Sequence, residues 1–212
     1  MPRGECTVKV VSFDLDGTLV HRDYVDYFWL ELVPRLYAEE RGMSVEEAKR
    51  VVLASYEEVG PRDIRWYLPS YWFHRFGISE HLDYALREAA RRVRLCEDAA
   101  EVIEALRGSY ELVISTSAPR VFIEVVMSRV PLLRESFTRV FSSTSDYGLP
   151  GKPVEFFANV IRELGVEPCE VLHAGDDEEF DYENPSKLGI KAYLVDREGG
   201  RDLRGLLSLL QH

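Results

Sequence analysis

The chain has 212 residues, of which 46% are hydrophobic and 30% charged, a composition typical of a folded globular protein rather than a disordered or fibrous one. Its formal net charge of −11 would repel nucleic-acid phosphates and anionic membranes, so we expect neither as a partner and favour a small molecule. No apolar stretch approaches the roughly 20 residues of a membrane span, and the first residues lack the apolar core of a signal peptide, so we expect a cytoplasmic protein. We expect it to be a monomer or a homodimer.

The first predicted element is a buried strand over residues 8–13, which is followed by the sequence DLDGT. Because side chains alternate along a strand, we expect Asp14 and Asp16 to point to one side while Leu15 points into the fold. Thr18 places a supporting hydroxyl beside the two acids. Two carboxylates this close repel each other unless a cation lies between them. The pattern therefore predicts a Mg²⁺ site with a carboxylate nucleophile and a general acid/base.

The next stretch, residues 21–95, has helical periodicity but no convincing strand. Apolar residues recur at helical spacing over residues 48–55 and again over residues 82–93. We therefore predict an all-helical insert directly after the first strand. Ligands of open α/β sheets bind at the carboxyl ends of the strands, so this insert is expected to form a lid over Asp14 and Asp16.

Two groups of residues in the insert are open to more than one interpretation. A dense aromatic run more often forms the core of a helical unit than a substrate pocket. This run comprises Trp66, Tyr67, Tyr71, Trp72, Phe73 and His74. The second group is either a hinge that reaches the substrate or an exposed linker, and comprises His21, Arg22, Tyr24, Tyr27 and Trp29.

After the insert, apolar strand-like segments alternate with helical periods. Such alternation predicts a parallel sheet that is covered by helices on both faces. The predicted helices span residues 99–106 and 154–164, and the predicted strands span residues 112–115, 140–142, 171–174 and 192–195.

Groups suited to bind phosphate follow two of these segments. Ser115, Thr116 and Ser117 end the second strand, and the free backbone amides of the helix that follows could hold an anion. One of these hydroxyls is expected to contact a phosphate oxygen. Lys152 lies in the loop GLPGKP, where it can neutralise charge on a transferring phosphoryl group.

Acidic residues follow the strand predicted over residues 171–174. The sequence GDDEEFD places Asp176, Asp177 and Asp181 at its end. Carboxylates are hard oxygen ligands, so this segment is the second expected source of Mg²⁺ ligands.

The three cysteines of the chain lie far apart and have no CxxC spacing. Such spacing indicates neither a disulfide framework nor a zinc site. We therefore expect Cys6, Cys96 and Cys169 to be unpaired and to pack as small buried hydrophobes.

Taken together, these segments resemble the four motifs of the haloacid dehalogenase superfamily of phosphohydrolases. DLDGT corresponds to the first motif, the strand ending in Thr116 to the second, Lys152 to the third and GDDEEFD to the fourth. The resemblance covers nearly the whole chain. It implies an α/β fold with a three-layer, Rossmann-like parallel sheet core, formed by residues 1–19 and 96–212, and an inserted all-helical cap at residues 20–95.

The resemblance also implies catalytic roles. Asp14 would be the nucleophile that forms an aspartyl-phosphate. Asp16 would protonate the leaving group and later activate water as a base. Thr116 and Lys152, with Ser117 beside them, would bind the substrate phosphate.

For the cofactor, the resemblance implies Mg²⁺. Its ligands would be Asp14, Asp176 and the backbone carbonyl of Asp16, with Asp181 as a supporting or water-mediated partner. Asp177 stands where the family commonly has Ser or Thr, and either tightens metal binding or only solvates the loop. The second motif usually ends in Ser or Thr followed by Asn, so Ser115 remains an alternative to Thr116.

A magnesium-dependent phosphatase acting on a small phosphorylated metabolite is the leading hypothesis. Asp16 argues against the dehalogenase branch of the superfamily, which lacks this acid. The alternatives are a phosphotransferase or phosphomutase built on the same core, or a non-catalytic binding protein. Phosphoglycolate, sugar phosphates and nucleoside monophosphates all stay open as substrates.

Overall fold

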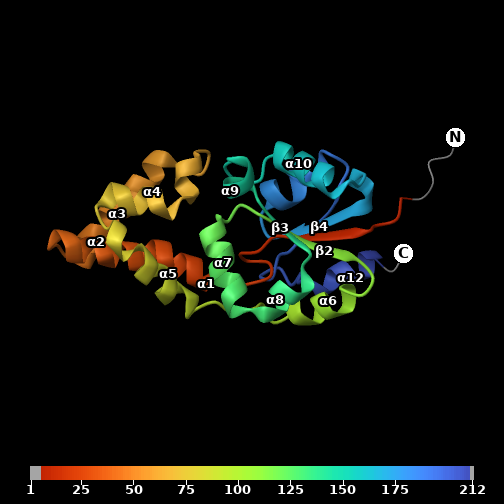
Figure 1. Ribbon diagram of the computed structural model, residues 1–212, viewed down its shortest axis with the longest axis horizontal. Coiled ribbons are helices and arrows are strands. Elements are labelled where there is room, and N and C mark those ends of the chain that lie inside the picture. Colours follow the sequence, from red (N-terminus) through yellow and green to blue (C-terminus); the bar gives the residue numbers. More distant parts are fainter. Residues whose placement is uncertain (1–5, 211–212) are drawn as a thin grey trace.

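Five parallel strands form a single sheet in the computed structural model, which describes residues 6–210 (Figure 1). Their order is β3-β2-β1-β4-β5, and each neighbouring pair runs parallel. This confirms the predicted parallel sheet, and each strand begins and ends within two residues of its predicted bounds. The strands are β1 (Val10–Phe13), β2 (Glu111–Thr116), β3 (Arg139–Ser142), β4 (Val171–Gly175) and β5 (Lys191–Leu194).

Alternation along the central strand explains why helices cover both faces of the sheet. Val11 and Phe13 belong to one apolar cluster, whereas Val10 belongs to another on the opposite face. A parallel sheet that is apolar on both sides must be covered on both sides. Figure 1 shows α10 on one side of the sheet and α6, α8 and α12 on the other.

The helices of these two outer layers come from the chain after residue 95. On the Phe13 side lie α6 (Ala99–Leu106), α7 (Arg120–Arg129), α8 (Pro131–Ser136) and α12 (Arg204–Leu210). On the Val10 side lie α9 (Ser143–Tyr147) and α10 (Val154–Leu164). Three short helices lie before and after β4, namely η4 (Pro168–Glu170), η5 (Glu178–Glu183) and α11 (Asn184–Ser186).

Every element described between β1 and β2 is helical, as the periodicity of the insert predicted. The chain leaves the sheet and returns to it through two adjacent segments, which a bridge between Val20 and Leu95 joins. The His21 amide also donates to the Arg94 carbonyl at 3.0 Å. The elements of the insert are α1 (Asp23–Tyr27), η1 (Phe28–Leu32), α2 (Val33–Arg41), α3 (Val45–Val59), η2 (Ile64–Tyr67), α4 (Pro69–Phe76), η3 (Ser79–His81) and α5 (Leu82–Ala90).

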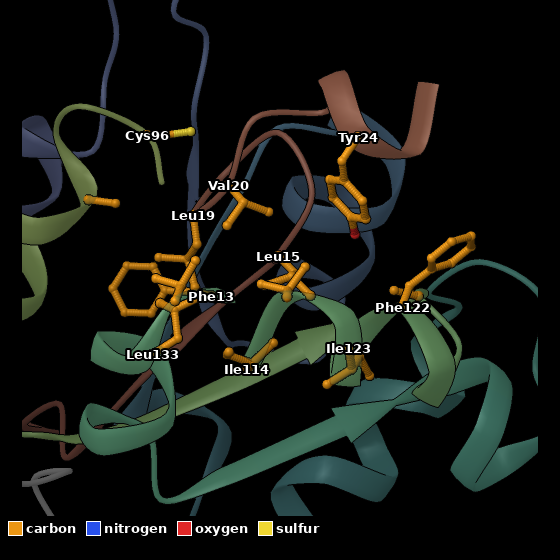
Figure 2. Close-up of a cluster of buried hydrophobic side chains, with 14 of the residues drawn as sticks. Phe13, Leu15, Leu19, Val20, Tyr24, Cys96, Ile114, Phe122, Ile123 and Leu133 are labelled. Atoms are coloured by element: carbon orange, nitrogen blue, oxygen red, sulfur yellow. The ribbon is translucent and has the colours of Figure 1, made fainter. Parts of the chain in front are cut away.

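The insert packs directly against the sheet unit through aromatic side chains. Tyr24 and Phe28 contact Phe122 of α7 edge-on, with ring centroids 6.1 and 4.9 Å apart. Figure 2 shows Tyr24 and Phe122 beside the buried cluster around Phe13 and Leu15. Leu15 is fully buried there, which confirms that it points into the fold. One continuous apolar cluster therefore joins the insert to the sheet unit.

The prediction of three unpaired cysteines was wrong. Cys6 and Cys169 form a disulfide, and only Cys96, which is buried, is free. The two bonded residues are 163 positions apart, so no local spacing pattern reveals them. They meet because β1 and β4 are neighbours in the sheet and the Lys9 amide donates to the Glu170 carbonyl at 2.8 Å just before those strands begin.

Across residues 6–210, the helices are all too short or too polar to cross a membrane.

Candidate active site

The sequence-predicted acids and hydroxyls converge at the carboxyl ends of the three central strands. Phe13 of β1 lies opposite Ile114 on β2 and Ala174 on β4, so the residues that follow these positions meet at one edge. They line a cavity of about 460 Å³ between the sheet unit and the insert. All of the residues predicted for the site line this cavity, apart from Thr18 and the alternative hydroxyl of Ser115.

Asp14 and Lys152 form a buried ion pair at the bottom of the cavity. The Lys152 ammonium donates to Asp14 Oδ1 at 2.7 Å and also pairs with Asp181. Burial raises the pKa of Asp14, whereas for Lys152 the two neighbouring carboxylates outweigh burial and raise its pKa. The lysine is therefore a fixed positive charge beside the predicted nucleophile.

The loop that carries Lys152 depends on the preceding glycine. Gly151 has a φ of +62°, and a Cβ there would lie 2.5 Å from Cζ of Phe180. Only glycine fits both the left-handed backbone and this close approach. The Lys152 carbonyl is held in addition by Asn184, whose Nδ2 donates at 3.1 Å. The GLPGKP sequence thus explains how the ammonium is directed at Asp14.

Asp16 is held by a residue that sequence analysis left ambiguous. The Tyr24 hydroxyl, from the insert, donates to Asp16 Oδ1 at 2.5 Å. Burial raises the pKa of Asp16 to about 7, although the Tyr24 hydrogen bond acts in the opposite direction. A carboxyl with a pKa near neutrality can both give and accept a proton, as a general acid/base must.

Asp176 lies beside Asp14, at the end of β4. Burial and the Asp14 charge raise the pKa of Asp176 to about 6. Thr18 Oγ1 donates to its Oδ1 at 3.5 Å, and Arg22 lies 3.9 Å from its Oδ2. A Cβ at Gly17, which has a φ of +89°, would lie 2.2 Å from the same carboxylate. The glycine of DLDGT therefore lets Asp176 approach the first motif.

These carboxylates fit a divalent cation. Oxygens of Asp14, Asp176 and Asp181 all lie within 4.8 Å of one another. Carboxylate oxygens are the hard ligands that Mg²⁺ prefers. The mutual repulsion that raises the pKa of Asp176 is what a bound cation would relieve.

Asp181 is better placed to orient Lys152 than to bind a metal directly. Its Oδ1 accepts from His173 Nε2 at 2.9 Å and pairs with Lys152, and its Oδ2 accepts from the Asp177 amide at 3.1 Å. Burial alone would raise the pKa of Asp181, but Lys152 and His173 lower it to about 2. Both oxygens of this carboxylate are therefore engaged within the protein.

His173 is a site residue that sequence analysis missed. It is fully buried in β4, and its Nδ1 lies 2.9 Å from Ser12 Oγ, which in turn lies 2.8 Å from Ser115 Oγ. A series of hydrogen-bonded side chains thus runs through the sheet from Ser115 to Asp181. The available signal was a histidine inside the otherwise apolar strand sequence VLHAG.

This series of hydrogen bonds distinguishes the two candidate hydroxyls of the second motif. Ser115 is buried and turned toward Ser12, whereas Thr116 and Ser117 line the cavity. Thr116 Oγ1 accepts from the Ala118 amide at 3.2 Å, which leaves its own hydroxyl proton free to point to a ligand. Between Ser115 and Thr116, the threonine is the residue at the cavity.

The expectation that the backbone amides at the start of the helix after Ser117, which is α7, are free to hold an anion was wrong in part. The Ala118 amide donates to Thr116, and the Arg120 amide donates to Ser145 Oγ at 2.9 Å. Pro119 has no N–H. These side-chain acceptors, which lie up to 25 positions away, compete with a ligand for the same donors.

Asp177, which was expected either to tighten metal binding or to solvate the loop, makes a local structural contact. Its Oδ1 accepts from the Phe180 amide at 2.8 Å and so caps η5. Because η5 carries Asp181, this cap helps to position the carboxylate that holds Lys152.

The outer wall of the cavity is aromatic and comes largely from the insert. Trp66 and Tyr67 line it, whereas Trp72 and Phe73 are fully buried, so the aromatic run contributes to both the pocket and the insert's core. Arg22 lines the cavity, while His21 pairs with Glu97 at 3.1 Å outside it. The other aromatic members of the wall are Trp29, Tyr56, Phe122 and Phe180.

Comparison with known proteins gives consistent results. Residues 8–183 match the family model described as haloacid dehalogenase-like hydrolase. The GMP/IMP nucleotidase YrfG of Escherichia coli is 26% identical over 185 residues, which cover 87% of this chain and 81% of the relative.

Solved structures share the architecture. A HAD phosphatase from Thermococcus onnurineus superposes with a TM-score of 0.82 at 25% identity, covering 96% of this chain and 98% of the other. A 2-haloacid dehalogenase from Pseudomonas syringae pv. Tomato superposes with a TM-score of 0.68 at 19% identity, covering 97% and 99% of the two chains. At that identity, the second likeness concerns the fold alone.

Proposed function

Because the chain belongs to the haloacid dehalogenase-like hydrolases, we propose that it is a magnesium-dependent phosphatase of a small phosphorylated metabolite. The family match, with a phosphatase and a nucleotidase among the relatives, confirms the motif-based resemblance and the prediction of a phosphatase enzyme. The observation that carries the proposed mechanism is the buried Asp14–Lys152 pair, with Asp16 two residues along the same segment.

In the first half of the proposed reaction, an Asp14 carboxylate oxygen attacks phosphorus. A P–O bond to Asp14 forms while the bond to the ester oxygen breaks. Lys152 balances the charge of the phosphoryl group, and the Thr116 and Ser117 hydroxyls donate to its oxygens. Asp16 gives its proton to the departing ester oxygen.

In the second half, Asp16 takes a proton from water, and the water oxygen attacks the aspartyl-phosphate. Inorganic phosphate leaves and Asp14 is regenerated as a carboxylate. Mg²⁺, held by Asp14, Asp176 and the Asp16 carbonyl, would supply positive charge against the phosphate when bound.

A nucleoside monophosphate is the substrate class we place first. The aromatic wall suits a planar base, because aromatic rings stack on one another or meet edge to face. A relative with 26% identity is named a GMP/IMP nucleotidase, which supports the same choice.

The proposed division of labour assigns residues 1–19 and 96–212 to a catalytic core and residues 20–95 to a cap. Support comes from the bridge between Val20 and Leu95, where the chain crosses between the two units. Within the core, residues 1–5 and 211–212 lie outside the described residues.

A panel of phosphorylated metabolites tests this function through the inorganic phosphate released by purified protein in Mg²⁺ buffer. Purine nucleoside monophosphates are expected to be the best substrates, and excess chelator should abolish release reversibly. Calcium should bind but support little turnover, since it takes more ligands at longer distances. Undiminished activity in chelator would refute the role of the metal. Transfer of phosphate to an added alcohol would identify a phosphotransferase instead.

A further inference from the structure

Tyr24 connects the insert to the predicted general acid. The residue lies in α1, the first helix of the insert, and its side chain is fully buried. Its hydroxyl donates to Asp16 Oδ1 at 2.5 Å. Among residues 6–210, no other side chain donates a hydrogen bond to the Asp16 carboxyl. Figure 2 shows the Tyr24 ring extending from α1 toward the segment that carries Leu15.

Contacts hold both the Tyr24 ring and the start of the helix that carries it. The edge of the ring packs against Phe122 of α7 at 6.1 Å between centroids. At the start of α1, Asp23 pairs with Arg94, and the His21 amide donates to the Arg94 carbonyl at 3.0 Å. The helix is therefore anchored at the point where the chain enters the insert, and the phenol has little freedom to turn.

We propose that Tyr24 is a positioning residue that aligns the Asp16 carboxyl for proton transfer to the leaving group. The hydrogen bond fixes one carboxyl oxygen, Oδ1, and so leaves the other oxygen to face the ester oxygen in the cavity. General acids act only within hydrogen-bonding reach of the proton acceptor, so fixing the carboxyl matters for the rate. Tyr24 itself takes no part in bond making.

This inference rests on the proposed phosphatase function. It adds that the acid is aligned by a residue of the insert, not of the sheet unit. The insert therefore contributes to proton transfer as well as to the wall of the cavity.

The variant Tyr24→Phe tests the proposal, because it removes the hydroxyl and keeps the ring that packs against Phe122. We compare kcat/KM for phenyl phosphate and 4-nitrophenyl phosphate, which have similar shapes. Phenolate is the poorer leaving group and needs the proton, whereas 4-nitrophenolate does not. The variant should lose roughly 10-fold more kcat/KM on phenyl phosphate than on 4-nitrophenyl phosphate. The parameter kcat/KM reports the steps up to leaving-group departure, so later hydrolysis of the intermediate does not obscure the comparison.

Two further measurements separate positioning from a general structural effect. The inhibition constant of inorganic phosphate should stay unchanged in Tyr24→Phe, because the phosphate ligands are intact. In an Asp16→Asn background, Tyr24→Phe should cause no additional leaving-group-dependent loss, since residues that act as a unit are not additive.

Tyr193→Phe is the matched control. Its hydroxyl donates to the Asp202 carbonyl at 2.6 Å, and the residue does not line the cavity. It should keep the wild-type ratio between the two substrates. The thermal unfolding midpoint of each variant is measured first, so that the assays run at a temperature at which every variant is folded.

An equal loss on both substrates, or a full further loss in the Asp16→Asn background, would overturn the role of Tyr24. Either result would leave the phosphatase function standing, because that function is tested by the wild-type protein. A wild-type protein that released no phosphate from any ester would refute the function itself.

Discussion

At the scale of single residues, the site is organised around one positive charge placed among several negative ones. Lys152 is almost completely buried between Asp14 and Asp181. A buried charge is stable only when it is paired and hydrogen-bonded. The ammonium therefore holds the proposed nucleophile, Asp14, in place, and in the proposed reaction it also balances the charge of the phosphoryl group.

Replacing Asp14 with Asn keeps the side-chain shape but removes the proposed nucleophile. Turnover should fall by several orders of magnitude, the scale seen when a nucleophile is removed. Lys152 keeps Asp181 as a partner, so the fold should survive. Phosphate release and circular dichroism measure the two effects, with the exposed Asp83→Asn as the matched control. Near wild-type turnover in Asp14→Asn would end the covalent mechanism.

A second residue-scale feature is the contact between Arg197 and the first motif. Arg197 donates to the carbonyls of Gly17 and Thr18 at 2.5 and 2.8 Å, and to Asp98 Oδ1 at 2.8 Å. Asp98 is buried and also accepts from the Leu203 amide at 2.7 Å. Burial would raise the pKa of Asp98, but these partners lower it below its usual value.

Asp98 should therefore make stability depend on pH. A carboxyl whose pKa is lowered by folding contributes stability above its unfolded pKa of about 3.8 and loses it as the pH falls toward the folded value. Asp98→Asn should cost about 2 kcal/mol of unfolding free energy at pH 7. Urea unfolding at several pH values should show this difference shrinking below pH 4. A constant difference between pH 7 and pH 3 would contradict this account.

At the scale of elements, the disulfide ties the segment before β1 to η4, just before β4. It closes a loop that spans most of the chain, because Cys6 and Cys169 are 163 residues apart. Cross-links stabilise a protein chiefly by restricting its unfolded chain, and a long loop gives a larger effect.

Reduction of this disulfide should lower the midpoint of thermal unfolding. The expected loss is about 2–4 kcal/mol of unfolding free energy. Calorimetry with and without a reductant measures it. The variant Cys6→Ser should start from the lower midpoint and show no response to the reductant. An equal response in both proteins would assign the effect to something other than this bond.

At the scale of the whole molecule, the cavity exists only because the insert and the sheet unit close on each other. The sheet unit supplies the acids, Lys152 and the hydroxyls, and the insert supplies most of the aromatic wall. The two units also share one apolar cluster. We therefore propose that the sheet unit supplies the reacting groups and that the insert selects the substrate, while Tyr24 of the insert also aligns Asp16.

Trp66→Ala should therefore change substrate preference more than chemistry. It removes one ring of the wall that comes from the insert and leaves the acids untouched. We expect kcat/KM for a purine nucleoside monophosphate to fall about 10-fold or more, as truncating a large aromatic contact does at binding sites. Hydrolysis of ribose 5-phosphate, which has no base, should change little. Parallel losses on both substrates would argue against base recognition by this wall.

Much of the fold and part of the site could be predicted from the sequence, because the relevant signals are local. Buried strands appear as short apolar runs, and the acids that follow such runs must lie at the carboxyl edge of a parallel sheet. Asp14, Asp16 and Asp176 were placed in this way, and the structure brings them together with Lys152, which the loop GLPGKP and the family resemblance indicated. The helical character of the insert followed from periodicity alone.

Other features depend on contacts between residues far apart in the chain, which only the tertiary structure decided. The Cys6–Cys169 disulfide spans 163 positions, and the Ser12–His173 hydrogen bond spans 161. No composition or spacing rule links such pairs, because their approach results from the packing of neighbouring strands. The same holds for the division of the aromatic run, where Trp66 faces the cavity and Trp72 the core. Helical periodicity places both residues in the insert, but which side meets the sheet unit depends on how the two units pack.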